Sequence, residues 1–208
     1  MSRGALTQLR DLVPLRPLSQ SEALRIAELQ ADRLLKLAGL SAPPVPDDLI
    51  LEIPKIQVRY MTPWPVSGCV DWTGAMWTIA LNAAEPRVRQ RFSLAHEFKH
   101  IVDHKFVKLL YPGLPTMGSR ARAEAICDYF AGCLLVPKPW LRRAWTEGRQ
   151  DRRALARNFD VSVAAIEVRL SQTGVARSYE RCWARPQHSD WSSDSYRREF
   201  SSRSSVAV

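Results

Sequence analysis

The ten-residue segment 91–100, RFSLAHEFKH, constrains the fold and chemistry of this 208-residue chain more than any other stretch. It contains the pattern H-E-x-x-H, with His96 and His100 four positions apart. In an α-helix this spacing places two imidazoles about 40° apart and one turn along the axis, so both can reach one metal ion. Glu97 would project beside them, where a carboxylate can take a proton from metal-bound water.

The residues around this pattern predict a helix with one buried side. On a helical wheel the apolar residues fall within an arc of about 100°, and the ligand-type residues fall on the opposite side. The apolar set is Leu94, Phe98, Ile101 and Val102, and the polar set is His96, His100, Asp103 and His104. This separation favours a metal site over a solvated polar helix that happens to carry two histidines.

Two histidines leave a zinc site one protein ligand short. The longer pattern H-E-x-x-H-x-x-G-x-x-H is absent, because Asp103 stands at the glycine position and Phe106 at the last one. A second amphipathic segment, 122–135, places Glu124 and Asp128 one turn apart, opposite its apolar residues. We predict that Glu124 is the third ligand and that Asp128 accepts a hydrogen bond from a ligating imidazole.

Several assignments stay open at this point. Asp103 is one turn from His100 and is an alternative acceptor for that hydrogen bond. His104 is a rival third ligand, but ligands at positions i, i+4 and i+8 would spread over about 12 Å of helix axis. His104 is therefore expected at the rim of the site. Tyr111 and Tyr129 are both candidate donors to the oxyanion.

The chain before this segment predicts the rest of an α+β fold. Residues 1–20 mix Arg, Pro and Ser and indicate a flexible lead, followed by a packing helix. Residues 49–81 have strand patterns that predict a small antiparallel sheet. An extended substrate is expected to pair with the edge of its last strand, 76–81. The metallopeptidase domain, with its leading helix, would cover residues 21–140.

The chain after this domain is basic and then rich in serine. Residues 141–185 predict a helix-turn-helix-like hairpin around the turn 158–160, and the net charge of +9 permits a nucleic-acid or acidic partner. Ala164 and Ala165 leave the second helix with few base-reading side chains, which favours packing over DNA binding. The tail 186–208 has few aliphatic residues and is expected to be disordered.

Composition also bears on the cellular compartment. The four cysteines show neither C-x-x-C spacing nor the density of a disulfide scaffold. No run approaches the roughly 18 apolar residues of a membrane span, and the N-terminus lacks the apolar core of a signal peptide. We therefore expect a cytoplasmic protein with no membrane partner.

Two motifs carry a resemblance to a known family. The segment 92–100, F-S-L-A-H-E-x-x-H, and the segment 124–137, E-x-x-x-D-x-F-A-x-x-L-L-x-P, resemble the ImmA/IrrE metallo-endopeptidases, peptidase family M78. The resemblance spans roughly residues 24–175. One departure is Phe98-Lys99, where the family often has Leu-Gly. This departure is expected to place a charged group near the site and to change substrate preference.

The resemblance implies a minimal thermolysin-like (gluzincin) fold with one Zn²⁺ per chain. It implies that His96, His100 and Glu124 bind this zinc and that Glu97 is the general base. Members commonly cleave helix-turn-helix repressors of mobile elements or stress regulons, so the implied substrate is such a repressor. The alternative functions are a DNA-binding transcriptional regulator and a zinc-binding sensor without proteolytic activity.

Overall fold

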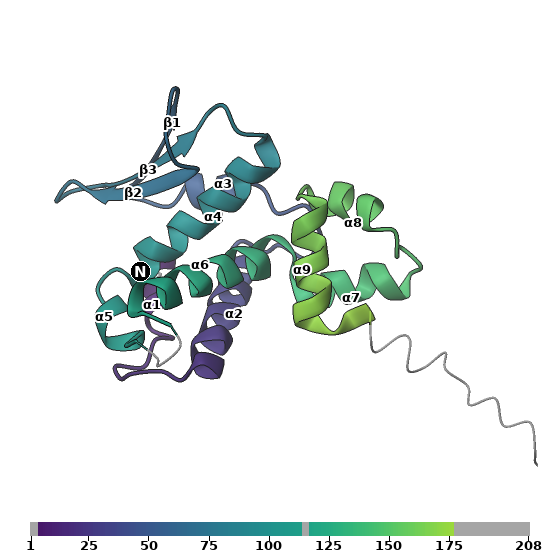
Figure 1. Cartoon of the computed structure of the whole chain (residues 1–208), viewed down its shortest axis with the longest axis horizontal. Helices are drawn as coiled ribbons and strands as arrows, with labels where there is room; N and C mark the ends of the chain where they lie inside the picture. The colour runs from purple at the N-terminus through teal and green to yellow at the C-terminus, as the bar shows by residue number, and fades with distance from the viewer. Residues whose placement is uncertain (1–3, 114–116, 177–208) are drawn as a thin grey trace, which may run out of the picture. The chain divides into compact units, whose positions relative to one another are not determined.

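The computed structural model describes residues 4–113 and 117–176 (Figure 1). Its helices are α1 (Ala5–Arg10), α2 (Gln20–Leu37), α3 (Asp48–Leu51), α4 (Arg87–Asp103), α5 (Val107–Leu110), α6 (Ser119–Leu135), α7 (Lys138–Thr146), α8 (Arg152–Phe159) and α9 (Val163–Thr173). Its strands are β1 (Ile56–Met61), β2 (Gly68–Trp72) and β3 (Trp77–Asn82).

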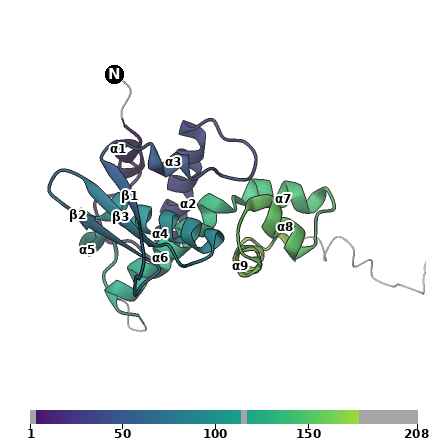
Figure 2. The ribbon, with the colours of Figure 1, turned by 90° about the horizontal axis from the view of Figure 1, so that it is seen from above.

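The elements around α4 form successive layers. The sheet lies against α4, α4 packs against α6, and α6 packs against α2 (Figure 1). Figure 2 shows the strands in front of α4. The side of α4 predicted to be buried is buried: Leu94, Phe98, Ile101 and Val102 are at most 3% exposed. The apolar side of the helical wheel is therefore confirmed, whereas Asp103, which the wheel places on the polar side, is also buried, at 2% exposed.

The sheet is mixed, whereas an antiparallel sheet was expected. Its strand order is β1-β3-β2, in which β3 is antiparallel to β2 and parallel to β1. The β2–β3 connection is a tight turn, with Gly74 at a φ of +92° and the Thr73 N–H donating to the Met76 carbonyl. The β1–β2 connection contains Pro63 and Pro65, which lack N–H groups and disfavour a second tight hairpin.

The segment 1–20, expected to be a flexible lead, contains the helix α1. Leu9 on this helix is fully buried, and its carbonyl accepts a hydrogen bond from Gln30 on α2. The Arg10 guanidinium donates to the carbonyls of Ile101 (2.7 Å) and Val102 (3.1 Å) near the end of α4. These carbonyls belong to the last turn of a helix, where an outside donor is needed. One arginine thus fixes the N-terminal segment to α4.

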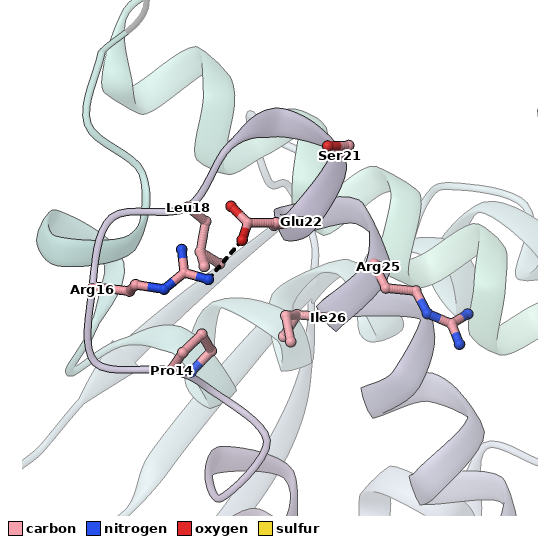
Figure 3. Close-up of a pocket in the computed structure, with 7 residues that line it drawn as sticks. All are labelled: Pro14, Arg16, Leu18, Ser21, Glu22, Arg25 and Ile26. Atoms are coloured by element: carbon pink, nitrogen blue, oxygen red, sulfur yellow. Dashed lines mark hydrogen bonds and ion pairs between the residues drawn. The ribbon is translucent and has the colours of Figure 1, made fainter.

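The start of α2 is fixed by a capping box. The Ser19 side chain accepts from the Glu22 N–H, and the Glu22 carboxylate accepts from the Ser19 N–H. Arg16 in the preceding loop pairs with Glu22 at 2.6 Å, above a cavity of about 340 Å³ (Figure 3). This cavity lies at the α1–α2 connection, and none of the predicted site residues lines it.

The helices α8 and α9 form a hairpin at the place expected from the sequence. Asp160 adopts the left-handed conformation after α8, and the Ser162 side chain caps α9. The buried Arg91 of α4 forms an ion pair with Asp160. On α6, a Cβ at Gly132 would lie 2.9 Å from Cδ of Arg169, so a glycine here permits close packing of α9. These contacts attach the hairpin to the helices that carry the site.

The fold tests neither the predictions for the C-terminal residues 177–208 nor the predicted cellular location. Residues 177–185 of the basic region and the predicted disordered tail 186–208 lie outside the described residues. Within the described ranges, no helix is both long enough and apolar enough to cross a membrane. The cytoplasmic location stays a prediction.

Candidate metal centre

The helix α4 brings the two histidines of the H-E-x-x-H pattern together. Their Nε2 atoms lie 3.1 Å apart, and both side chains are partly exposed, at 15% for His96 and 24% for His100. The opposite side of α4 is fixed in the core, so the backbone sets the direction of both imidazoles. The four-residue spacing places two nitrogen ligands at one point, as the sequence predicts.

The helix α6 brings a carboxylate to the same point. The Glu124 Oε2 atom lies 3.1 Å from His96 Nε2 and 3.5 Å from His100 Nε2. In a tetrahedral zinc site with bonds of about 2.0–2.1 Å, neighbouring ligand atoms lie about 3.3 Å apart. The three distances and the His₂Glu donor set therefore fit one zinc ion. The role of each residue as a ligand stays a prediction.

Cys127 is a ligand-type residue at this point that the sequence analysis did not assign. Ligand atoms of His96, His100 and Cys127 all lie within 4.8 Å of one another. The thiol is buried, and burial raises its pKa well above the ordinary value, so it stays protonated without a metal. Its position three residues after Glu124 places it on nearly the same side of α6, which is the sequence signal that could have identified it.

Asp128 lies one turn after Glu124 and contacts the other nitrogen of His96. The distance between Asp128 Oδ1 and His96 Nδ1 is 2.8 Å. A proton on Nδ1 that is donated to this carboxylate leaves the Nε2 lone pair directed at Glu124 and His100. Burial alone would lower the pKa of His96, but the hydrogen bond to Asp128 and the nearby carboxylates raise it above its ordinary value.

Glu97 is held between the helix and the sheet. Its side chain is 8% exposed, and burial is the main cause of a pKa above the ordinary glutamate value. A Cβ at Gly68 of β2 would lie 3.1 Å from both Cγ and Oε1 of Glu97. The absence of a side chain at Gly68 therefore lets this carboxylate lie against the strand beside the histidines.

Lys99 does not lie at the site, contrary to the expectation from the sequence. It is fully buried, and its Nζ donates to Gln30 of α2 (2.7 Å) and to Asp103 (2.5 Å). Its ammonium group is enclosed by Gln30, Asp103 and Tyr111 and does not reach the surface. A direct effect of this charge on the substrate is not supported.

The same network accounts for two other predicted site residues. Tyr111 is buried, and its hydroxyl donates to Asp103 Oδ2 at 2.5 Å. Burial, followed by the nearby Asp103 charge, raises the pKa of this phenol. The Tyr111 hydroxyl and the Lys99 ammonium group therefore donate to the same Asp103 carboxylate. Of the two acceptors considered for a histidine, Asp128 is the one with a hydrogen bond to an imidazole among the described residues.

The other candidate oxyanion donor, Tyr129, contacts α9. Its ring faces the guanidinium of Arg169 on α9 at 5.5 Å. His104, expected at the rim, packs its ring against Trp77 of β3 at 4.7 Å. Tyr111 lines a cavity that His100 and Glu97 also line, whereas Tyr129 does not line it, and the choice of oxyanion donor stays a prediction.

The buried ion pair between Lys99 and Asp103 should contribute strongly to stability. Changing Lys99 to methionine should lower the free energy of unfolding by about 3–5 kcal/mol, because it leaves the Asp103 carboxylate buried without its cation. Urea denaturation would measure this change. The double variant Lys99→Met/Asp103→Leu should regain most of the loss. If the single and double variants are equally stable, the ion pair has no such role.

The edge of the sheet at the site is β2, whereas the last strand was expected to provide it. Strand β3 is central and is paired on both sides. Beside the metal centre lies a cleft of about 780 Å³, lined by residues that include Gly68 and Trp72 of β2, Trp77, Glu97, His104 and Arg120. A backbone edge, the general-base candidate and an aromatic wall therefore border one cavity.

One solved structure gives an independent view of the fold. The chain is similar to a Mycobacterium tuberculosis transcriptional regulator, with a TM-score of 0.58 and 17% sequence identity. The similarity covers 81% of this chain and 52% of that chain, so this chain spans about half the length of that protein. At this identity the likeness shows the fold alone. No curated protein sequence matches the chain.

The sequence itself shows the family. Residues 52–171, more than half of the chain, match the family Peptidase_M78, described as the IrrE N-terminal-like domain. The matched range includes both motifs around His96 and Glu124, all of α8, and α9 as far as residue 171. The resemblance noted from the motifs is therefore confirmed, and the chain belongs to the Peptidase_M78 family.

Proposed function

We propose that the chain is a zinc-dependent endopeptidase that hydrolyses a peptide bond in a regulatory protein. The convergence of His96, His100 and Glu124 on one point, with Glu97 beside them, is the observation that carries this proposal. Membership of a peptidase family supports it. The three convergent residues would hold one Zn²⁺ per chain.

The chemistry divides between the metal and the side chains. Bound zinc would lower the pKa of a coordinated water toward about 7 and polarise the scissile carbonyl. Glu97 would accept the water proton and later deliver it to the leaving amine, a role that suits a carboxylate whose pKa is raised by burial. Asp128 would keep the His96 ring in the tautomer that presents Nε2.

The substrate backbone would bind at the edge of β2. Among the described strands, β2 has a neighbouring strand on one side only, and it lines the cleft with Glu97. An extended peptide that adds to a sheet edge forms main-chain hydrogen bonds whatever its sequence. The aromatic wall of Trp72 and Trp77, whose ring centroids are 4.8 Å apart, would contact its side chains. This placement brings the scissile bond beside Glu97.

The proposed substrate is a helix-turn-helix repressor, cut at one or a few bonds. The motif resemblance is the first support for this proposal, and the basic surface of α7 and α8 is the second. Exposed cations on these helices are Lys138, Arg142, Arg143, Arg152, Arg153 and Arg157. Incubation with a repressor encoded by a neighbouring gene, and separately with casein, tests the proposal. Efficient, unselective digestion of casein would contradict it.

The second function to consider is a DNA-binding transcriptional regulator. The printed description of the similar Mycobacterium tuberculosis protein and the basic α8–α9 hairpin favour it. Against it, Val163, Ala164 and Ala165 begin α9 without hydrogen-bonding side chains for base edges. Gel-shift titration with DNA upstream of the same repressor gene separates the two functions. Tight, sequence-specific binding without proteolysis would select the regulator.

Charge reversal on α8 should slow cleavage of the repressor. The change Arg152→Glu/Arg153→Glu should reduce kcat/KM several-fold and weaken its dependence on salt, because exposed charges assist encounter with an acidic partner. Zinc content should not change. The matched control is Arg33→Glu/Lys36→Glu on α2, which alters net charge equally. Equal slowing by both variants would assign the effect to net charge and refute docking on α8.

A further inference from the structure

A second cavity lies beside the metal centre and is separate from the cleft that β2 and Glu97 line. It has a volume of about 520 Å³ and lies where α4, α6 and α9 meet. We call it the α9 groove, and its main lining residues are Phe92, Asp128, Tyr129, Gly132, Ala165 and Val168. Asp128 is hydrogen-bonded to His96, so the groove begins at the metal centre itself.

The α9 groove and the cleft extend from the metal centre in opposite directions along the same two helices. On α4, Phe92 lies one turn before His96, whereas His104 of the cleft lies two turns after it. On α6, Gly132 lies two turns after Glu124, whereas Arg120 of the cleft lies one turn before it. Residues four apart on a helix share one side, so the two cavities flank the convergent histidines and glutamate.

The walls of the α9 groove are largely apolar. Val168 is 53% exposed and lines the groove together with Phe92 and Tyr129. Ala165 adds only a methyl group to the wall, and at Gly132 the Arg169 side chain packs against α6. Arg169 donates to the Val136 carbonyl and lies against the Tyr129 ring, so Phe92, Ala165 and Val168 form the open apolar part of the wall.

The exposed charged groups at the rim of the groove have both signs. The Arg89 guanidinium lies 5.8 Å from the centroid of the Phe92 ring, and its side chain is 55% exposed and pairs with Glu85 at 3.9 Å. The Asp128 side chain is 61% exposed, although it contacts His96. The rim therefore selects neither sign of charge in a neighbouring substrate residue, and the apolar wall is the feature that can select a side chain.

We propose that the α9 groove binds an apolar side chain of the substrate. This inference rests on the proposed peptidase function and deepens it, since it makes α9 a specificity-determining wall of the active site. The substrate chain then passes from the β2 edge across the metal centre to α9. The hairpin is needed for substrate choice as well as for packing.

A matched pair of variants on α9 tests the inference. Val168→Glu places a charge in the groove wall, whereas Val163→Glu changes an exposed valine (37%) on the same helix that lies outside the lining. The substrates are fluorescence-quenched peptides with leucine, phenylalanine, serine or lysine at one varied position, next to glutamate or lysine. The zinc-loaded full chain is assayed for KM and kcat, and zinc content is measured in parallel.

We expect the wild-type protein to prefer leucine or phenylalanine at the varied position, whether glutamate or lysine stands next to it. Val168→Glu should raise KM for these peptides about 10–100-fold, the usual effect of losing an apolar subsite, with kcat and zinc content unchanged. Val163→Glu should behave as wild type. If Val168→Glu and Val163→Glu have the same selectivity, the inference is overturned. The inference is also overturned if Val168→Glu only abolishes self-association of the chain, which would assign the groove to a second copy.

A binding assay separates failure of this inference from failure of the peptidase proposal. The same peptides, fluorescently labelled, are titrated against proteins that also carry Glu97→Gln, and anisotropy reports binding without hydrolysis. If the wild-type protein cuts no peptide but Val168→Glu weakens binding of the leucine peptide, the groove stands and the peptidase proposal fails. If binding is unaffected by Val168→Glu, the groove does not hold the substrate.

Discussion

The change Glu97→Gln should reduce the rate of peptide hydrolysis by about 10²–10⁴-fold while zinc binding is retained. The expected loss is the usual contribution of a positioned general base. Glutamine has nearly the same shape, so the contact with Gly68 and the burial of the side chain are kept. Single-turnover cleavage of a repressor and metal analysis of the same sample would measure both quantities.

The control for this variant is Glu147→Gln, an exposed glutamate at the end of α7. It should retain both activity and zinc. Loss of zinc from Glu97→Gln would place Glu97 among the ligands and refute its assignment as the base. Retention of full activity would show that another group takes the proton.

The change Glu124→Ala should weaken zinc binding far more than Asp128→Ala. Glu124 is placed at ligand distance from both imidazoles, whereas Asp128 contacts the far nitrogen of His96. Removing a hydrogen-bond partner of a ligand costs about 10–100-fold in metal affinity, and removing the ligand itself should cost well beyond that range. Competition with a chromophoric chelator would give both affinities.

Cys127 provides the rival assignment in the same experiment. Its thiol lies near the histidine pair and is the only other ligand type grouped with them among the described residues. If Glu124 is the third ligand, Cys127→Ser should change zinc affinity little. A large loss in Cys127→Ser, together with a small loss in Glu124→Ala, would assign a His₂Cys site instead. Negligible effects of both changes would show that the third ligand lies elsewhere.

The site was largely predictable because its signals are local. The i, i+4 spacing fixes the relation of His96 to His100, and a second helix with carboxylates one turn apart supplies Glu124 and Asp128. Each relation depends on the geometry of one helix, which hydrophobic periodicity reveals. The meeting of α4 and α6 was inferred from the missing third ligand and from the family resemblance, and the structure shows it in the 3.1 Å and 3.5 Å contacts of Glu124.

The features that were missed depend on contacts between distant segments. The order of the strands is set by pairing between β1 and β3, which alternation of apolar residues does not encode. Arg10 reaches the end of α4 from about ninety positions away, and Lys99 is buried because α2 supplies Gln30. A charged residue on a helical wheel is ordinarily placed at the surface, so its burial depends on partners that the wheel does not show.

Intact-mass analysis of a helix-turn-helix repressor after incubation with the zinc-loaded chain tests the central claim most directly. The repressor is the one encoded beside this chain, and parallel samples contain Glu97→Gln or a zinc chelator. The account predicts one or a few defined peptide cuts with the wild-type protein and none in the two parallel samples. An intact repressor in every sample, or equal cutting with and without Glu97, would contradict it.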